Sequence, residues 1–148
     1  MSFQVGQVVD HYRIDRVVAT TPSVTVFEAF DLRLLRRVAL KELVPELSAA
    51  PALRARFARD AARAAQLDHP GIASVFDSNE SAGNLYFVTK LVDGVSLREI
   101  AHRGRVPVAD AITYLEQVAG ALDYAHRRGV VHGRVGLAAV LIGSDDAD

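Results

Sequence analysis

The spacing of hydrophobic residues changes period along the chain, and this limits the possible folds more than any other feature. Five segments alternate β-branched or aromatic residues with polar ones, as half-buried strands do: 11–20, 24–32, 36–44, 71–80 and 84–92. Between the third and fourth of these, residues 51–67 repeat their apolar residues at helical spacing, and residues 108–128 do so again over a longer stretch. The pattern predicts an α+β fold in which a five-stranded antiparallel sheet, with one inserted helix, precedes a mainly helical segment.

Single residues indicate where these helices begin and end. Ser48 is the expected N-cap of the first helix, and Pro51 suits its first turn. Gly129 stands where a C-terminal glycine ends the long helix. One face of the long helix is apolar: Ile112, Leu115, Ala119, Leu122 and Ala125.

Composition excludes several classes of protein. The 148 residues are 50% hydrophobic and 24% charged, which is typical of a globular domain, and the net charge of -1 predicts neither a nucleic-acid nor an anionic-membrane partner. The chain has no cysteine, and its five histidines lack metal-ligand spacing, so no metal is expected. It has no membrane-length apolar run and no signal-peptide pattern at its start, so a cytoplasmic protein is expected. The richness in Arg and Ala suggests a bacterial source.

Four motifs resemble protein kinases, specifically the bacterial serine/threonine kinases of eukaryotic type. In chain order they are VALKEL, LDHPGIASVFD, LVDGVSL and ALDYAHRRGVVHGRV, and together they extend over nearly the whole sequence. The resemblance implies a kinase N-lobe over residues 1–92, with its five-stranded sheet and helix C. It implies a partial C-lobe over 93–148, with helices D and E and a catalytic loop. The similarity ends before the Asp-Phe-Gly segment, so a C-terminally truncated kinase fold is expected.

The kinase phosphate loop is altered in this sequence. The three glycines that let backbone N–H groups approach the phosphates correspond to Ala19, Thr21 and Val24. Pro22 removes a further backbone donor. The segment can form a turn, but it is expected to be a poor phosphate cradle.

Lys41 matches the kinase lysine that pairs with the nucleotide phosphates. The alternative, a solvated strand lysine, is less compatible with the VAL-K sequence around it. Its glutamate partner corresponds to Asp60, which is one methylene shorter. Asp60 either pairs with Lys41 or belongs to a solvated helix face, and the sequence leaves both open.

The catalytic loop has lost its working side chains. His132 is present, but by resemblance it supports the loop and does not touch phosphate. Arg134 replaces the catalytic aspartate, and a protonated guanidinium cannot accept a hydroxyl proton. Gly136 replaces the loop lysine, and Ala139 replaces the asparagine that holds magnesium. The pattern is that of a pseudokinase without catalytic residues or a metal site.

Part of an adenine slot remains by resemblance. Its walls would be Val18, Val26, Ala39, Thr89 and Leu141, and the hinge backbone at Lys90 and Val92 would offer hydrogen bonds. No cofactor is required, but weak, magnesium-independent binding of ATP or ADP is expected. The alternative is that these are ordinary core residues that close the slot.

Two functions from different classes follow. The first is an inactive kinase-like domain that regulates or scaffolds a protein partner, or associates with itself. The second is an ATP-binding serine/threonine kinase, or a fragment of one, with residual or complemented phosphotransfer. The arginines at 54, 56, 59 and 63 form either a solvated helix face or a docking face.

Overall fold

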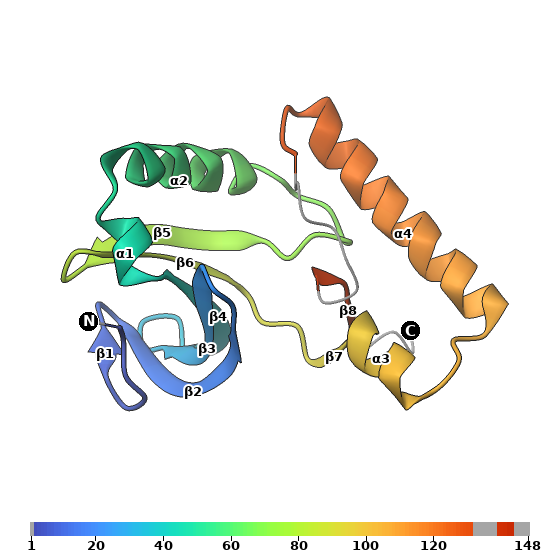
Figure 1. The fold of residues 1–148 in the computed structure, drawn as a ribbon, viewed down its shortest axis with the longest axis horizontal. Helices are drawn as coiled ribbons and strands as arrows, with labels where there is room; N and C mark the ends of the chain where they lie inside the picture. The colour runs from blue at the N-terminus through green and yellow to red at the C-terminus, as the bar shows by residue number, and fades with distance from the viewer. Residues whose placement is uncertain (1, 132–138, 144–148) are drawn as a thin grey trace. The chain divides into compact units, whose positions relative to one another are not determined.

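The computed structural model describes residues 2–131 and 139–143, shown as a ribbon in Figure 1. The chain divides into two compact units. The first comprises Met1–Leu67 and Ser74–Leu91, and the second comprises Asp68–Ala73 and Val92–Asp148. The division after residue 91 lies next to the expected boundary after residue 92, while residues 68–73 group with the second unit.

An antiparallel sheet of six strands organises the first unit, in the order β1-β2-β3-β4-β6-β5 (Figure 1). Its strands are β1 (Val8–Val9), β2 (Tyr12–Thr20), β3 (Val24–Asp31), β4 (Arg36–Leu43), β5 (Val75–Ser81) and β6 (Asn84–Lys90). The five predicted strands are confirmed as β2 to β6. The expected count of five is corrected to six, because the two-residue β1 also pairs with β2 and is too short to show a period.

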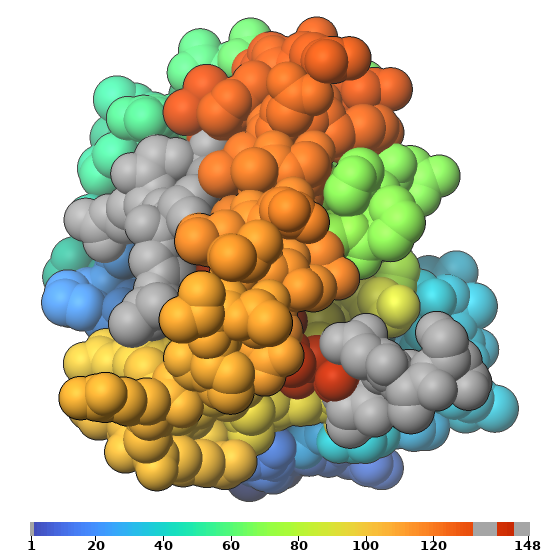
Figure 2. Space-filling view, turned by 90° about the vertical axis from the view of Figure 1, so that its right-hand side faces the viewer, coloured from blue at the N-terminus to red at the C-terminus, as the bar shows by residue number. Residues whose placement is uncertain are grey.

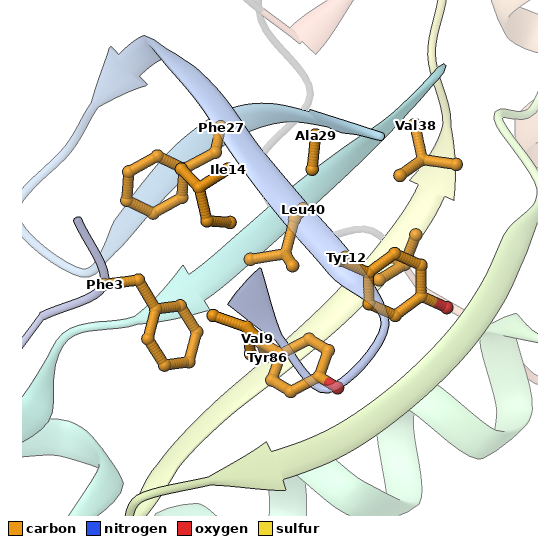
Figure 3. Close-up of a cluster of buried hydrophobic side chains, with 10 residues drawn as sticks. Phe3, Val9, Tyr12, Ile14, Phe27, Ala29, Val38, Leu40 and Tyr86 are labelled. Atoms are coloured by element: carbon orange, nitrogen blue, oxygen red, sulfur yellow. The ribbon is translucent and has the colours of Figure 1, made fainter. Parts of the chain in front are cut away.

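The core of this unit lies on one face of the sheet. Alternation along β4 turns Val38 and Leu40 into the core, where both are fully buried. Aromatic side chains from four segments join this cluster, and Tyr86 lies edge-on to both Phe3 and Tyr12 (Figure 3). The remaining members of the cluster are Val9, Ile14, Phe27, Ala29 and Val88. The opposite face of the same strands is left for the residues of the candidate site.

Two helices follow β4: α1 (Pro45–Ser48) and α2 (Pro51–Ala64). Pro51 opens α2 as predicted, but Ser48 does not cap it, since the N-cap is Ala50 and no side chain bonds there. Ser48 instead ends α1, and its hydroxyl oxygen accepts the backbone N–H of Leu85 at 3.2 Å. The unpredicted α1 has only four residues, which is too short for helical periodicity.

In the described part of the second unit lie β7 (Gly94–Ser96), α3 (Leu97–Arg103), α4 (Val108–Arg127) and β8 (Leu141–Gly143). The Ser96 hydroxyl oxygen accepts the Glu99 N–H at 3.1 Å and so caps α3. The predicted long helix is confirmed as α4. Gly129 ends it at φ +76°, and the N–H of Val130 donates to the Ala125 carbonyl at 2.9 Å, as in a Schellman motif.

The sequence of residues 130–143, VVHGRVGLAAVLIG, has the pattern of a buried strand, a tight turn and another strand. Among the residues of this segment that the structure describes, only the second strand is present, as β8, which pairs with β7. Val130 and Val131 are not in a strand, and Val131 is 76% exposed, so the expectation of a buried first strand is wrong. Residues 132–138, which include Val135 and the expected turn, lie outside the described residues.

The apolar face of α4 is only partly buried. Ala125 is buried and Leu122 is half-buried, whereas Ile112 and Leu115 are 51% and 67% exposed. Val108, one helical turn before Ile112, is 75% exposed. Val108, Ile112 and Leu115 therefore form an uncovered apolar stripe on α4. The surface of α4 is visible along most of its length in Figure 2. Among the helices that the structure describes, none combines the length and the apolar character that a membrane crossing needs.

Candidate functional site

The strand register brings several of the predicted site residues to one face of the sheet. On β4, Ala39 and Lys41 point away from the core, because they alternate with Val38 and Leu40. Their cross-strand partners share that face: Val26 lies opposite Lys41 on β3, and Thr89 lies opposite Ala39 on β6. Val18 lies on β2 within the irregular pairing between Val17 and Ala19, and is 48% exposed.

The turn between β2 and β3 stands where a kinase has its glycine-rich loop. The Thr21 N–H donates to the Val24 carbonyl at 2.9 Å. The Thr21 hydroxyl oxygen accepts the N–H of Val24 at 3.0 Å and that of Ser23 at 3.4 Å. Pro22 has no N–H. Every backbone position from 21 to 24 is therefore bonded within the turn or lacks a donor, so the turn offers no ready cradle for phosphate.

Of the two alternatives for Asp60, the structure does not show the pair with Lys41. The Asp60 carboxylate is exposed on α2, where it lies 3.6 Å from the Arg56 guanidinium and 3.9 Å from that of Arg59. These contacts favour the solvated-face alternative. The Lys41 ammonium instead lies 5.4 Å from the centre of the Phe87 ring, and burial lowers its pKa. It makes no ion pair with any carboxylate among the described residues.

The hinge backbone is partly committed to the fold. The N–H of Lys90 donates to the Ser74 carbonyl at 2.9 Å, so it is not free for a base. The Lys90 carbonyl accepts a long contact of 3.3 Å from the Thr89 hydroxyl. Thr89 itself is buried, at 4% exposure. A ligand on this edge would therefore use the carbonyl of Lys90 and not its N–H.

Val92 and Leu141 belong to the second unit. Leu141 lies opposite Ser96 in the β7–β8 ribbon and is 49% exposed. Ala139 is exposed, and its methyl group cannot ligate a metal. His132, Arg134 and Gly136 lie outside the described residues. Within the described part of the chain, no three His, Asp or Glu side chains gather as a metal-ion site would require.

A glycine makes the β7–β8 ribbon possible. A Cβ on Gly94 would lie 1.8 Å from the carbonyl oxygen of Ile142 and 2.7 Å from its carbonyl carbon. Only hydrogen fits at that position. This explains why the LVDGVSL motif carries a glycine here.

Two aromatic residues near Lys41 were not among the predicted site residues. Phe87 lies directly opposite Lys41 in the β4–β6 register, and Phe57 on α2 lies 5.6 Å from Phe87, ring centre to ring centre. The strand pattern contained a signal for Phe87, because it alternates with Tyr86 and Val88. Its pairing with Lys41 depends on a register that one sequence does not specify.

Comparison with known families matches residues 16–146 to the protein kinase domain. The chain belongs to the protein kinase family. The serine/threonine-protein kinase PknA of Mycobacterium tuberculosis is 42% identical over 149 residues, which cover 96% of this chain and 35% of PknA. PknB of Mycobacterium leprae is 37% identical over 143 residues, covering 93% of this chain and 23% of PknB.

A solved structure gives the same result for the fold. The PknI kinase domain of Mycobacterium tuberculosis superposes with a TM-score of 0.86 at 33% identity. The match covers 98% of this chain and 60% of that one. The predicted kinase resemblance and the α+β kinase-like fold are thus confirmed, with bacterial serine/threonine kinases as relatives. The chain spans about a third of PknA and a quarter of PknB.

Proposed function

We propose that this chain is a catalytically inactive kinase-like domain that acts as a regulatory or scaffolding protein-binding module. The observation that carries the proposal is Arg134 at the position of the catalytic base. Loss of a positioned base costs on the order of 10²–10⁴ in rate. Gly136 and Ala139 extend the loss to the loop lysine and to a metal ligand, so charge stabilisation is lost as well.

The β2–β3 turn supports the same proposal independently. Its backbone donors bond to Thr21 and Val24, and so are not available to phosphate. Asp60 is held by neighbouring arginines on its own helix, away from Lys41. The nucleotide-positioning groups and the catalytic groups are thus both altered, although they lie far apart in the sequence.

The second candidate is an ATP-dependent serine/threonine kinase, or part of one, that works with residues supplied from elsewhere. Lys41 favours it, because the lysine is in register on β4 with Val26 and Phe87 beside it. Arg134 and Gly136 disfavour it, because residues supplied elsewhere leave that arginine at the position of the base.

Phosphotransfer separates the two candidates. The purified chain is incubated with radiolabelled ATP, with Mg²⁺ or Mn²⁺, and with a basic protein substrate, beside the PknA kinase domain as a positive control. We expect no incorporation, and none after Arg134→Asp alone, because Gly136 and Ala139 remain. Incorporation that disappears in Lys41→Met would overturn the proposal.

Weak nucleotide binding is compatible with an inactive domain. Lys41 and the apolar slot residues would supply the affinity, which we expect at roughly 0.1–1 mM, or about 4–5.5 kcal/mol. ADP and ATP should bind alike and with little need for Mg²⁺. Ligand at ten times its dissociation constant stabilises by about 1.4 kcal/mol, so the melting temperature should rise by a few degrees at most. A large rise that requires Mg²⁺ would indicate an intact metal site.

The partner, or a second copy of the chain, would bind at the uncovered stripe of α4. Val108, Ile112 and Leu115 lie one helical turn apart on one side of α4, and all three are more than half exposed. Sedimentation should show association that Leu115→Asp abolishes. Val5→Asp, at a residue 58% exposed in the first unit, is the matched control and should leave association unchanged. A clean monomer at tens of micromolar, with no pull-down partner, would count against this surface.

A further inference from the structure

Lys41 has an unusual environment for a half-buried cation. Its side chain leaves β4 on the face opposite the hydrophobic core, between Val26 on β3 and Phe87 on β6. The ammonium lies 5.4 Å from the centre of the Phe87 ring, within the range of a cation–π contact. Since no carboxylate of the described residues pairs with it, the electron-rich ring face is the group that offsets its charge.

The aromatic group extends from the sheet to the helix. Phe57 lies on α2 with its ring centre 5.6 Å from that of Phe87, and the two ring planes are tilted by 56°. Such tilted pairs are a favourable aromatic geometry. Because Phe57 contacts Phe87 from the helix side, it limits the movement of that ring against Lys41. A chain of contacts therefore runs from α2 through two rings to the ammonium.

The charged groups around Lys41 do not compete with this arrangement. On α2, the exposed Asp60 carboxylate makes ion-pair contacts with Arg56 at 3.6 Å and with Arg59 at 3.9 Å. On β3, Glu28 is bound by Arg16 and Arg37, and hydrogen bonds from Arg37 and then Arg16 lower the pKa of its carboxyl. On β6, the neighbour on the same face is Thr89, which carries no charge. Both carboxylates are thus neutralised by arginines.

We propose that Phe57 and Phe87 are positioning residues that hold the Lys41 ammonium in place of a carboxylate partner. Phe87 holds the charge directly, and Phe57 braces the Phe87 ring from α2. The inference rests on the proposed nucleotide role of Lys41 for its functional meaning. Its structural content concerns the ligand-free protein alone, so it is tested without nucleotide.

The small number of lysines makes the NMR signal of the Lys41 side chain easy to resolve. Lys41 and Lys90 are the only lysines among the 148 residues, so protein labelled with ¹³C-lysine gives two side-chain ε-CH₂ signals. Lys90 is exposed and serves as the internal reference. Lys41→Arg and Lys90→Arg assign the two signals. A lysine above a ring face has its ε protons shifted upfield, whereas a lysine paired with a carboxylate does not.

We expect the Lys41 ε protons upfield of those of Lys90, and the pKa of Lys41 below its ordinary value because of burial. Phe87→Leu should abolish the upfield displacement, Phe57→Leu should reduce it, and Phe87→Tyr should retain it. Phe76→Leu is the matched control, because Phe76 stacks with Arg36 and not with Lys41, and it should change nothing. Asp60→Asn should also leave the Lys41 signal and its titration unchanged.

Three results would overturn the proposal. The first is a Lys41 signal that coincides with that of Lys90 in the parent protein. The second is a Lys41 signal or titration that moves in Asp60→Asn, because the carboxylate would then hold the lysine. The third is an upfield displacement that survives in Phe87→Leu. If Phe87→Leu fails to fold, the parent, Phe87→Tyr and Asp60→Asn still decide the question. Failure of nucleotide to bind leaves all these outcomes unchanged.

Discussion

Replacing Gly94 with alanine should open the β7–β8 ribbon. The new Cβ would lie 1.8 Å from the Ile142 carbonyl oxygen, 2.7 Å from its carbon and 2.9 Å from the Gly143 Cα, all of them backbone atoms. Side-chain rotation cannot relieve this clash, so one strand has to move. The ribbon contains three residue pairs, and backbone hydrogen bonds contribute about 0.5–1.5 kcal/mol each. We therefore expect the ribbon to lose about 2 kcal/mol of local stability.

Gly143 provides the matched control, because it lies directly opposite Gly94 in the same ribbon. Among the described residues, a Cβ there meets only the Asp93 carbonyl oxygen and the Val92 Cγ1, both at 3.9 Å, which is ordinary contact. The assay is amide hydrogen exchange at Leu97, whose N–H donates to the Val140 carbonyl at 2.8 Å. Exchange at Leu97 should accelerate about 30-fold in Gly94→Ala, the equivalent of that 2 kcal/mol. It should stay near the parent rate in Gly143→Ala, and equal rates in the two variants would refute the reasoning.

Three further predictions test other parts of the fold. Burial raises the pKa of Glu42, so the folded protein holds that proton more tightly than the unfolded chain, and stability should fall as pH rises through the raised pKa. Glu42→Gln should remove that part of the pH dependence in urea titrations between about pH 4 and 8. Gly120→Ala should stabilise the protein by roughly 0.8–1 kcal/mol, because alanine is the better helix former and its methyl group meets no atom of the described residues beyond the backbone of its own helix. Gly129→Ala should destabilise the protein by about 1 kcal/mol, because the backbone there has a φ of +76°. Urea unfolding midpoints measure both effects. Arg54→Ala should cost about 1 kcal/mol by losing hydrogen bonds to the Ser48 and Gly83 carbonyls, while the exposed Arg59→Ala should be near neutral in the same titrations.

The periodicity of hydrophobic residues was sufficient to predict the elements longer than about six residues. Strands β2 to β6 and helices α2 and α4 each repeat their apolar residues often enough to reveal a period. The helix expected over 51–67 ends at Ala64, because its last residues form a turn in which the Leu67 N–H bonds to the Ala64 carbonyl. Strand β1 and helix α1 have two and four residues, so neither completes a repeat that a sequence could display.

The sequence was sufficient to predict which residues face the candidate site. It was less informative about which of them contact one another, because those contacts depend on the register between strands. Lys41 lies on the predicted strand face because it alternates with core residues. The true neighbour of its ammonium is Phe87, and that contact requires β6 to pair beside β4 in one particular register. Asp60 matched a sequence position, but its nearness to Arg56 and Arg59 decided its partners. Short-range ion pairs on a helix compete directly with a longer-range pair to the sheet.

If this chain is catalytically inactive, as we propose, the arrangement of β4 explains how it keeps the kinase fold. Val38 and Leu40 face the hydrophobic core, while Ala39 and Lys41 face the site, so the same strand serves two separate purposes. The altered positions at 19–24 lie at the end of β2, in a turn that bonds to itself, and none of them belongs to the core cluster. Substitutions there cost little core packing, and folding does not select against them. A chain under selection only to keep its shape for a partner would therefore retain β4, Phe87 and the Gly94 ribbon, and would be free to lose the phosphate loop.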